Sequence, residues 1–129
     1  MDPDKKTRIL VVEDDKLFLW TLNHFLQREG YEVFSAPTGE LAFDMAKEQP
    51  FDIVISDFHL PGLNGRDLIR KLKNMHPFTK TVLISAYQRD EVAGEDEMLL
   101  NGYLNKPIEL CILKQMLQNL TAASDGMNA

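Results

Sequence analysis

Short apolar runs alternate along the chain with segments whose apolar residues recur at helical spacing. The five runs are RILVV (8–12), YEVFSA (31–36), Ile53 to Ile55 in a strand that ends at Asp57, TVLIS (81–85) and GYLN (102–105). Unbroken, β-branched runs of this length predict buried strands. The segments between them predict helices at 16–29, from Thr38 to before Pro50, at 66–75, and around Leu113 to Leu120. Gly30 suits the end of the first helix and Thr38 the start of the second.

One segment interrupts this alternation. The stretch AYQRDEVAGEDEMLLN, residues 86–101, is rich in acids and has apolar periodicity only around Met98 to Leu100. A fourth helix between the fourth and fifth strands is therefore expected to be short or partly unwound.

Buried strands separated by helices predict a parallel sheet that is covered on both faces by right-handed crossovers. Five such units make a small doubly wound α/β fold. In this architecture ligands bind beyond the carboxyl ends of the strands, near the point where the strand order reverses. The strand ends are therefore where chemistry is expected.

Acidic residues gather at these ends. Glu13, Asp14 and Asp15 follow the first strand, and Asp57 ends the third. Carboxylates that point into one crevice raise each other's pKa unless a cation lies among them. Mg²⁺ prefers oxygen ligands, keeps several waters and is commonly shared with phosphate oxygens. The pattern predicts a magnesium site with a phosphate-bearing partner.

Two further strand ends carry a hydroxyl and an ammonium group. Ser85 ends the fourth strand, and Lys106 follows the fifth, directly before Pro107. These groups suit the phosphoryl oxygens that a metal does not bind. Asp57 lies between them and could attack phosphorus to become an aspartyl phosphate.

Each of these residues also has a purely structural interpretation. Asp14 or Asp15 could cap the following helix, and Asp15 is the expected cap. Lys106 taken alone would be a surface lysine, and Tyr103 could be a static ring at the sheet edge. The functional interpretation depends on Asp57, Asp14 and Lys106 occurring together.

Composition sets the limits of this interpretation. The chain has 129 residues, of which 44% are hydrophobic and 26% charged, as in an ordinary globular protein. A net charge of −6 disfavours nucleic-acid binding. The single Cys111, the absence of a membrane-length apolar stretch and the polar N-terminus lead us to expect a cytoplasmic protein without membrane contact. We divide the chain into an N-terminal extension (1–7), one domain (8–120) and a flexible tail (121–129).

Four motifs in order give the chain a family resemblance. ILVVEDD, DIVISDFHLPGLNG, VLISA and GYLNKP, at 9–15, 52–65, 82–86 and 102–107, resemble the receiver domains of two-component response regulators, the family of the chemotaxis regulator. The likeness covers residues 7–120. It implies a flavodoxin-like five-stranded sheet of order 2-1-3-4-5, and phosphorylation of the domain by a histidine kinase or histidine phosphotransfer protein.

The resemblance also implies a role for each site residue. Asp57 would be the phosphoacceptor, and Glu13 and Asp14 the acidic pair that holds Mg²⁺ together with Asp57 and the backbone carbonyl of His59. Lys106 would pair with the phosphoryl group. The peptide bond between Lys106 and Pro107 would be cis. Ser85 and Tyr103 would form the switch that alters a protein-binding surface on the fourth helix, fifth strand and fifth helix. That surface could also form a homodimer or contact a downstream or fused effector.

Two alternatives stay open on the residues alone. A haloacid-dehalogenase-type aspartyl-phosphate phosphatase shares the nucleophilic aspartate, but that class has a second acid two residues later, where this chain has His59. A flavin-binding electron carrier shares the fold, yet acids follow the first strand in place of a phosphate-binding loop. We therefore expect a phosphorylation-switched binding domain and not a turnover enzyme.

Overall fold

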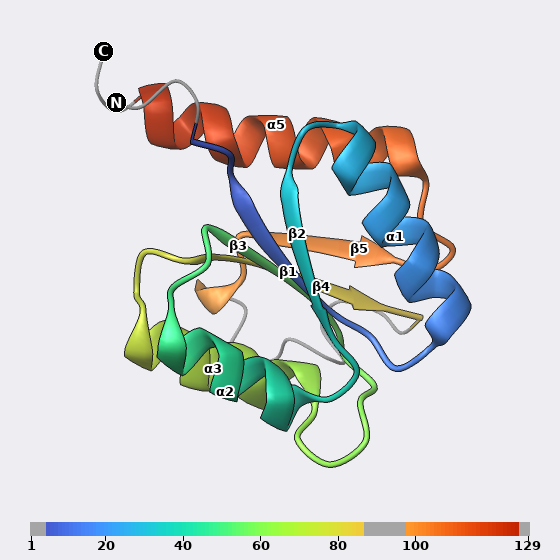
Figure 1. Ribbon diagram of the computed structural model, residues 1–129, viewed down its shortest axis with the longest axis vertical. Helices are drawn as coiled ribbons and strands as arrows, with labels where there is room; N and C mark the ends of the chain where they lie inside the picture. The colour runs from blue at the N-terminus through green and yellow to red at the C-terminus, as the bar shows by residue number, and fades with distance from the viewer. Residues whose placement is uncertain (1–4, 87–97, 127–129) are drawn as a thin grey trace.

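The computed structural model describes residues 5–86 and 98–126, and Figure 1 shows their arrangement. The elements are β1 (Arg8–Val12), α1 (Lys16–Arg28), β2 (Glu32–Ala36), α2 (Gly39–Glu48), β3 (Ile53–Asp57), α3 (Gly65–Met75), β4 (Lys80–Ser85), β5 (Gly102–Asn105) and α5 (Leu110–Gly126). The five strands form one parallel sheet in the order β2-β1-β3-β4-β5. The predicted doubly wound α/β class and strand order are confirmed.

Helices cover both faces of the sheet. In Figure 1, α1 and α5 lie on one face, and α2 and α3 lie on the other. Because successive strand residues point to opposite faces, the two cores share the same strands. Ile9 and Ile55 pack against the α1 and α5 side, whereas Leu10 and Val54 pack against α2 and α3. This explains why the central positions of β1, β3 and β4 are apolar in succession.

Both faces of the sheet carry a closely packed apolar core. Fully buried side chains from strands and helices include Ile9, Leu10, Leu22, Leu26, Ile53, Ile55, Leu68, Ile69, Leu72, Leu83, Ile84 and Leu113. Burying each of these stabilises the fold by about 1.5–3 kcal/mol relative to exposure. The packed strands hold the strand ends, and thus the candidate site, in fixed positions.

Three helices begin at the side chains that local chemistry favours. The Asp15 carboxylate accepts hydrogen bonds from backbone N–H groups in the first turn of α1, which confirms it as the cap. Thr38 caps α2 and Asn64 caps α3 in the same way. Gly30 follows α1 with a φ of 94°, a left-handed conformation that glycine adopts without strain.

The C-terminal part differs from the expectation in one respect. α5 continues to Gly126, past residue 120, so the first residues of the expected tail are helical. The division of the chain into extension, domain and tail otherwise stays a prediction. The expected short fourth helix falls largely on residues 87–97, which lie outside the described residues.

None of the helices in the described part of the chain combines the length and the apolar character that a membrane span requires. The peptide bond between Lys106 and Pro107 is cis, as the family resemblance implied.

Candidate functional site

The predicted site residues converge at the carboxyl edge of the sheet. Asp57 is the last residue of β3, Ser85 is the last residue of β4, and Lys106 directly follows β5. Glu13 and Asp14 follow β1, which is the neighbour of β3. Parallel pairing of β1, β3, β4 and β5 therefore brings together groups that are far apart in the sequence.

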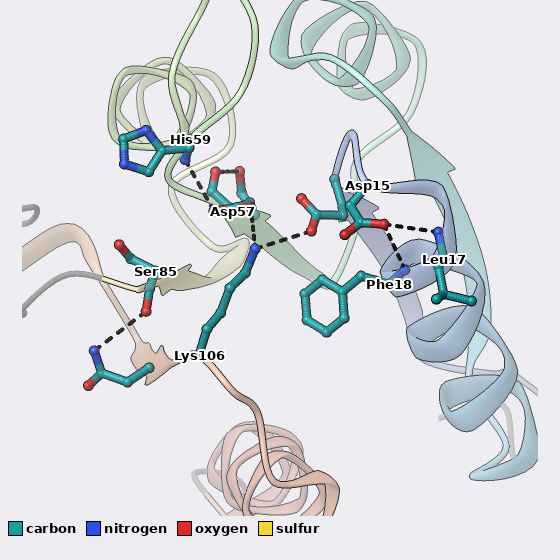
Figure 2. Close-up of polar contacts among 10 residues, drawn as sticks. Asp15, Leu17, Phe18, Asp57, His59, Ser85 and Lys106 are labelled. Atoms are coloured by element: carbon teal, nitrogen blue, oxygen red, sulfur yellow. Dashed lines mark hydrogen bonds and ion pairs between the residues drawn. The ribbon is translucent and has the colours of Figure 1, made fainter.

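Lys106 joins two of the acids directly. Its Nζ donates to Asp57 Oδ2 at 2.7 Å, which Figure 2 shows as a dashed line, and to Glu13 Oε1 at 3.3 Å. The Asp57 and Glu13 side chains are only 7% and 2% exposed, whereas that of Lys106 is 32% exposed. The two carboxylates are thus buried, whereas the lysine side chain is partly exposed.

Three carboxylates form a compact group. One ligand atom from each of Glu13, Asp14 and Asp57 lies within 4.8 Å of the others. Glu13 and Asp57 are buried, whereas Asp14 is exposed. The buried Glu13 Oε2 receives no hydrogen bond from the described residues. A buried carboxylate oxygen without a donor is unfavourable unless a cation or water binds it, so this donor set fits a hard dication.

The electrostatics of the group follow from burial. Burial, a hydrogen bond with Asp57 and the charge of Asp57 raise the pKa of Glu13 to about 8, against the opposing effect of Lys106. Burial acts to lower the pKa of Lys106, but the hydrogen bond to Asp57 and the charges of Asp57 and Glu13 raise it above its ordinary value. Lys106 is therefore firmly cationic, while Glu13 without a metal retains a proton at neutral pH.

The loop after β3 shapes the mouth of the site. The backbone N–H of His59 donates to Asp57 Oδ1 at 3.1 Å. The Gly65 N–H donates to the Phe58 carbonyl at 2.9 Å. A Cβ at Gly65 would lie 2.2 Å from the Asp57 carbonyl oxygen. Only glycine at position 65 allows α3 to start so close to the end of β3.

Ser85 and Tyr103 lie on the β4 and β5 side. Ser85 is fully buried, and its carbonyl accepts from the Lys106 N–H at 2.9 Å and from Asn105 Nδ2 at 3.4 Å. Tyr103 is half-buried and packs against Ile69 and Leu83. The pairing of β4 with β5 therefore places the two predicted switch residues close together in the sheet.

Sequence reasoning missed two residues that shape this site. In the sequence, Gly65 was only the last residue of a motif, although the close approach of α3 to the backbone at Asp57 depends on it. Phe18 lies in the segment 16–29, for which the sequence predicted only a helix, yet its ring centroid lies 5.0 Å from Lys106 Nζ. No spacing rule links residue 18 to residue 106, so only the folded chain could reveal this contact.

Comparison with known proteins supports the family resemblance over most of the chain. The family model described as the response regulator receiver domain matches residues 9–118. The virulence sensor protein BvgS of Bordetella bronchiseptica is 32% identical over 133 residues, covering 93% of this chain and 10% of BvgS. The transcriptional regulatory protein YkoG of Bacillus subtilis is 33% identical, covering 92% of this chain and 51% of YkoG.

Solved structures agree. The chemotaxis protein CheY4 of Vibrio cholerae superposes with a TM-score of 0.83 at 27% identity, covering 90% of this chain and 99% of CheY4. The response regulator TrrA of Thermotoga maritima, solved in complex with Mg²⁺–BeF, gives 0.82 at 29% identity, with 90% and 99% covered. Since this chain spans about a tenth of BvgS and half of YkoG, the likeness concerns one domain of these relatives. Family model, relatives and fold together establish that the chain belongs to the response regulator receiver domains.

Proposed function

We propose that Asp57 accepts a phosphoryl group from the phosphohistidine of a histidine kinase or a histidine phosphotransfer protein, in a Mg²⁺-dependent step. The observation that carries this proposal is the position of the Asp57 carboxylate. It lies 2.7 Å from the Lys106 ammonium and within 4.8 Å of two further acids, at the end of a buried strand. A nucleophile between a fixed cation and a candidate metal site suits phosphoryl transfer, because catalysis there is mainly positioning and charge neutralisation.

In the proposed step, one carboxylate oxygen of Asp57 forms a bond to phosphorus while the bond between phosphorus and the donor's imidazole nitrogen breaks. The imidazole keeps the electron pair of that bond and takes up a proton. Lys106 Nζ, which already binds Asp57 Oδ2, donates hydrogen bonds to the arriving phosphoryl oxygens. The His59 N–H fixes the other carboxylate oxygen, so the orientation of the nucleophile is set before the donor arrives.

Glu13, Asp14 and Asp57, with the backbone carbonyl of His59, would hold the metal. The fit rests on the three clustered carboxylates and on the buried Glu13 oxygen that receives no hydrogen bond. Mg²⁺, when bound, neutralises charge that gathers on phosphoryl oxygens. Asp14, the exposed member, is the acid best placed to meet a hydrated ion at the opening.

The proposed output is a change in the surface that binds other proteins. A phosphoryl group adds about two negative charges and strong acceptors, which the Ser85 hydroxyl and Lys106 would bind, with Tyr103 moving in response. The partners are the donor and a downstream or fused effector. A homodimer through the segment between β4 and β5, together with β5 and α5, is part of the proposal. The domain modifies itself and does not turn over a substrate, and its cytoplasmic location stays a prediction.

The haloacid-dehalogenase alternative has no observation in its favour, because position 59 holds histidine where that class has its second acid. Multiple turnover on a small phosphate ester would be the result that revives it.

Intact mass spectrometry after incubation with MgCl2 and acetyl phosphate tests the proposal. Wild type should gain one phosphoryl mass, and Asp57→Asn should gain none. Asp44→Asn, which removes an exposed carboxylate on α2, is the matched control and should be labelled like wild type. Undiminished labelling of Asp57→Asn would refute the assignment. Calorimetry with MgCl2 tests the metal site separately, and we expect binding heat that Asp14→Asn removes.

A further inference from the structure

The Lys106 ammonium has a third neighbour besides the two carboxylates. The Phe18 ring from the first turn of α1 lies beside it, with 5.0 Å between Nζ and the ring centroid. Figure 2 shows the ring on the α1 side of the lysine, next to the helix cap at Asp15. At this distance the negative face of an aromatic ring attracts an ammonium group.

Phe18 is itself held in place from two directions. Its backbone N–H donates to Asp15 Oδ1 at 3.3 Å, which fixes the first turn of α1. Its half-buried side chain packs against the core cluster that contains Leu22 and Leu113. The adjacent Leu17, by contrast, is 75% exposed. Phe18 is thus the first-turn apolar residue directed toward the site, and it has little freedom to move.

The two carboxylate partners of Lys106 change in the proposed reaction, whereas the ring does not. Asp57 would lose its carboxylate charge on becoming an acyl phosphate, and Glu13 would give oxygen atoms to the metal. A lysine side chain is long and flexible, so an ammonium group that must exchange carboxylate partners for phosphoryl oxygens can reorient during the exchange. The ring quadrupole is unaffected by either event, and it therefore offers a constant contact throughout the reaction.

We propose that Phe18 is a positioning residue for Lys106, and that its ring keeps the ammonium directed at the acceptor while Asp57 and Glu13 exchange their partners. This inference rests on the proposed function, because it assigns Lys106 a role at the phosphoryl group. The ring acts through Lys106 and does not itself touch reacting atoms.

Phe18→Leu and Phe18→Tyr form the matched pair for the test. Leucine keeps an apolar side chain for the core but has no ring face, whereas tyrosine keeps the ring. With acetyl phosphate and MgCl2, labelling of Phe18→Leu should be roughly fivefold slower than wild type, and Phe18→Tyr should remain within about twofold. Leu17→Ala, at the exposed neighbouring position, should label at the wild-type rate. Equal rates for the leucine and tyrosine variants, in folded protein, would overturn the inference.

A second measurement does not depend on any variant folding. NMR of the wild-type chain with selectively labelled lysine should place the Lys106 Hε protons upfield of the other lysines, through the ring current of Phe18. Hε protons at the position of an exposed lysine would show that the contact is absent in solution. The NMR result does not depend on which residue is the acceptor. Labelling that survives in Asp57→Asn refutes the proposed function, whereas Asp57-dependent labelling that is insensitive to the ring refutes the Phe18 inference alone.

Discussion

Replacing Glu13 by glutamine should change how the stability of the metal-free protein depends on pH. Glu13 is buried beside Asp57, and its pKa is raised from 4.5 to about 8. Between these values the unfolded chain releases this proton and the folded chain keeps it. Because the folded state then binds more protons than the unfolded state, wild-type stability should fall as pH rises from about 4.5 to 8.

The size of this change in stability follows from the same increase in the pKa of Glu13. One pKa unit corresponds to about 1.4 kcal/mol, so at pH 7 the loss of stability is about 3 kcal/mol. Between pH 5 and pH 7 it grows by about 2.5 kcal/mol. Glutamine has the shape of glutamate but cannot ionise, so Glu13→Gln should lack this slope. Comparing the two pH values cancels any constant packing effect of the substitution.

Urea unfolding in EDTA at a series of pH values measures this directly. The stability difference between Glu13→Gln and wild type should increase by about 2.5 kcal/mol from pH 5 to pH 7, which is a relative midpoint shift of about 1–2 M. Glu48→Gln, at an exposed position on α2, should run parallel to wild type. Adding MgCl2 should flatten the wild-type profile, because a bound dication stabilises the folded, deprotonated state. Parallel profiles for Glu13→Gln and wild type would refute the electrostatic reasoning.

Three further substitutions test how the site is supported. Gly65→Ala places a Cβ 2.2 Å from the Asp57 carbonyl oxygen, so unfolding by urea should show a loss of about 1–3 kcal/mol; a neutral result would mean that the loop shifts freely. Lys73→Met removes the Nζ hydrogen bonds to the Thr79 carbonyl and to Asn101 Oδ1, and should lower the free energy of unfolding by about 1–3 kcal/mol. Hydrogen exchange at the Asn101 N–H should become faster, and an unchanged exchange rate would contradict this prediction. Asp15→Ala removes the α1 cap and should lower stability by about 1 kcal/mol, a loss that an Asp15→Ser variant should largely restore.

The strand and helix pattern was readable from the sequence for a definite reason. Parallel strands buried on both faces must be apolar at nearly every position, so the runs around Ile9, Ile55 and Ile84 stand out from the helical spacing between them. Asp15 and Thr38 were predictable as caps because capping depends on a few neighbouring residues. The weak periodicity of residues 86–101 gave no comparable signal.

The convergence of Glu13, Asp57 and Lys106 was also predictable, since all parallel strands end at the same edge of the sheet. Only the tertiary structure decided the pKa values and the surrounding contacts of these groups. The burial that raises the pKa of Glu13, the backbone approach that requires Gly65 and the ring of Phe18 beside Lys106 depend on side-chain packing between elements distant in sequence. Local patterns determine which elements form and where they end, whereas such long-range contacts exist only once the chain is folded.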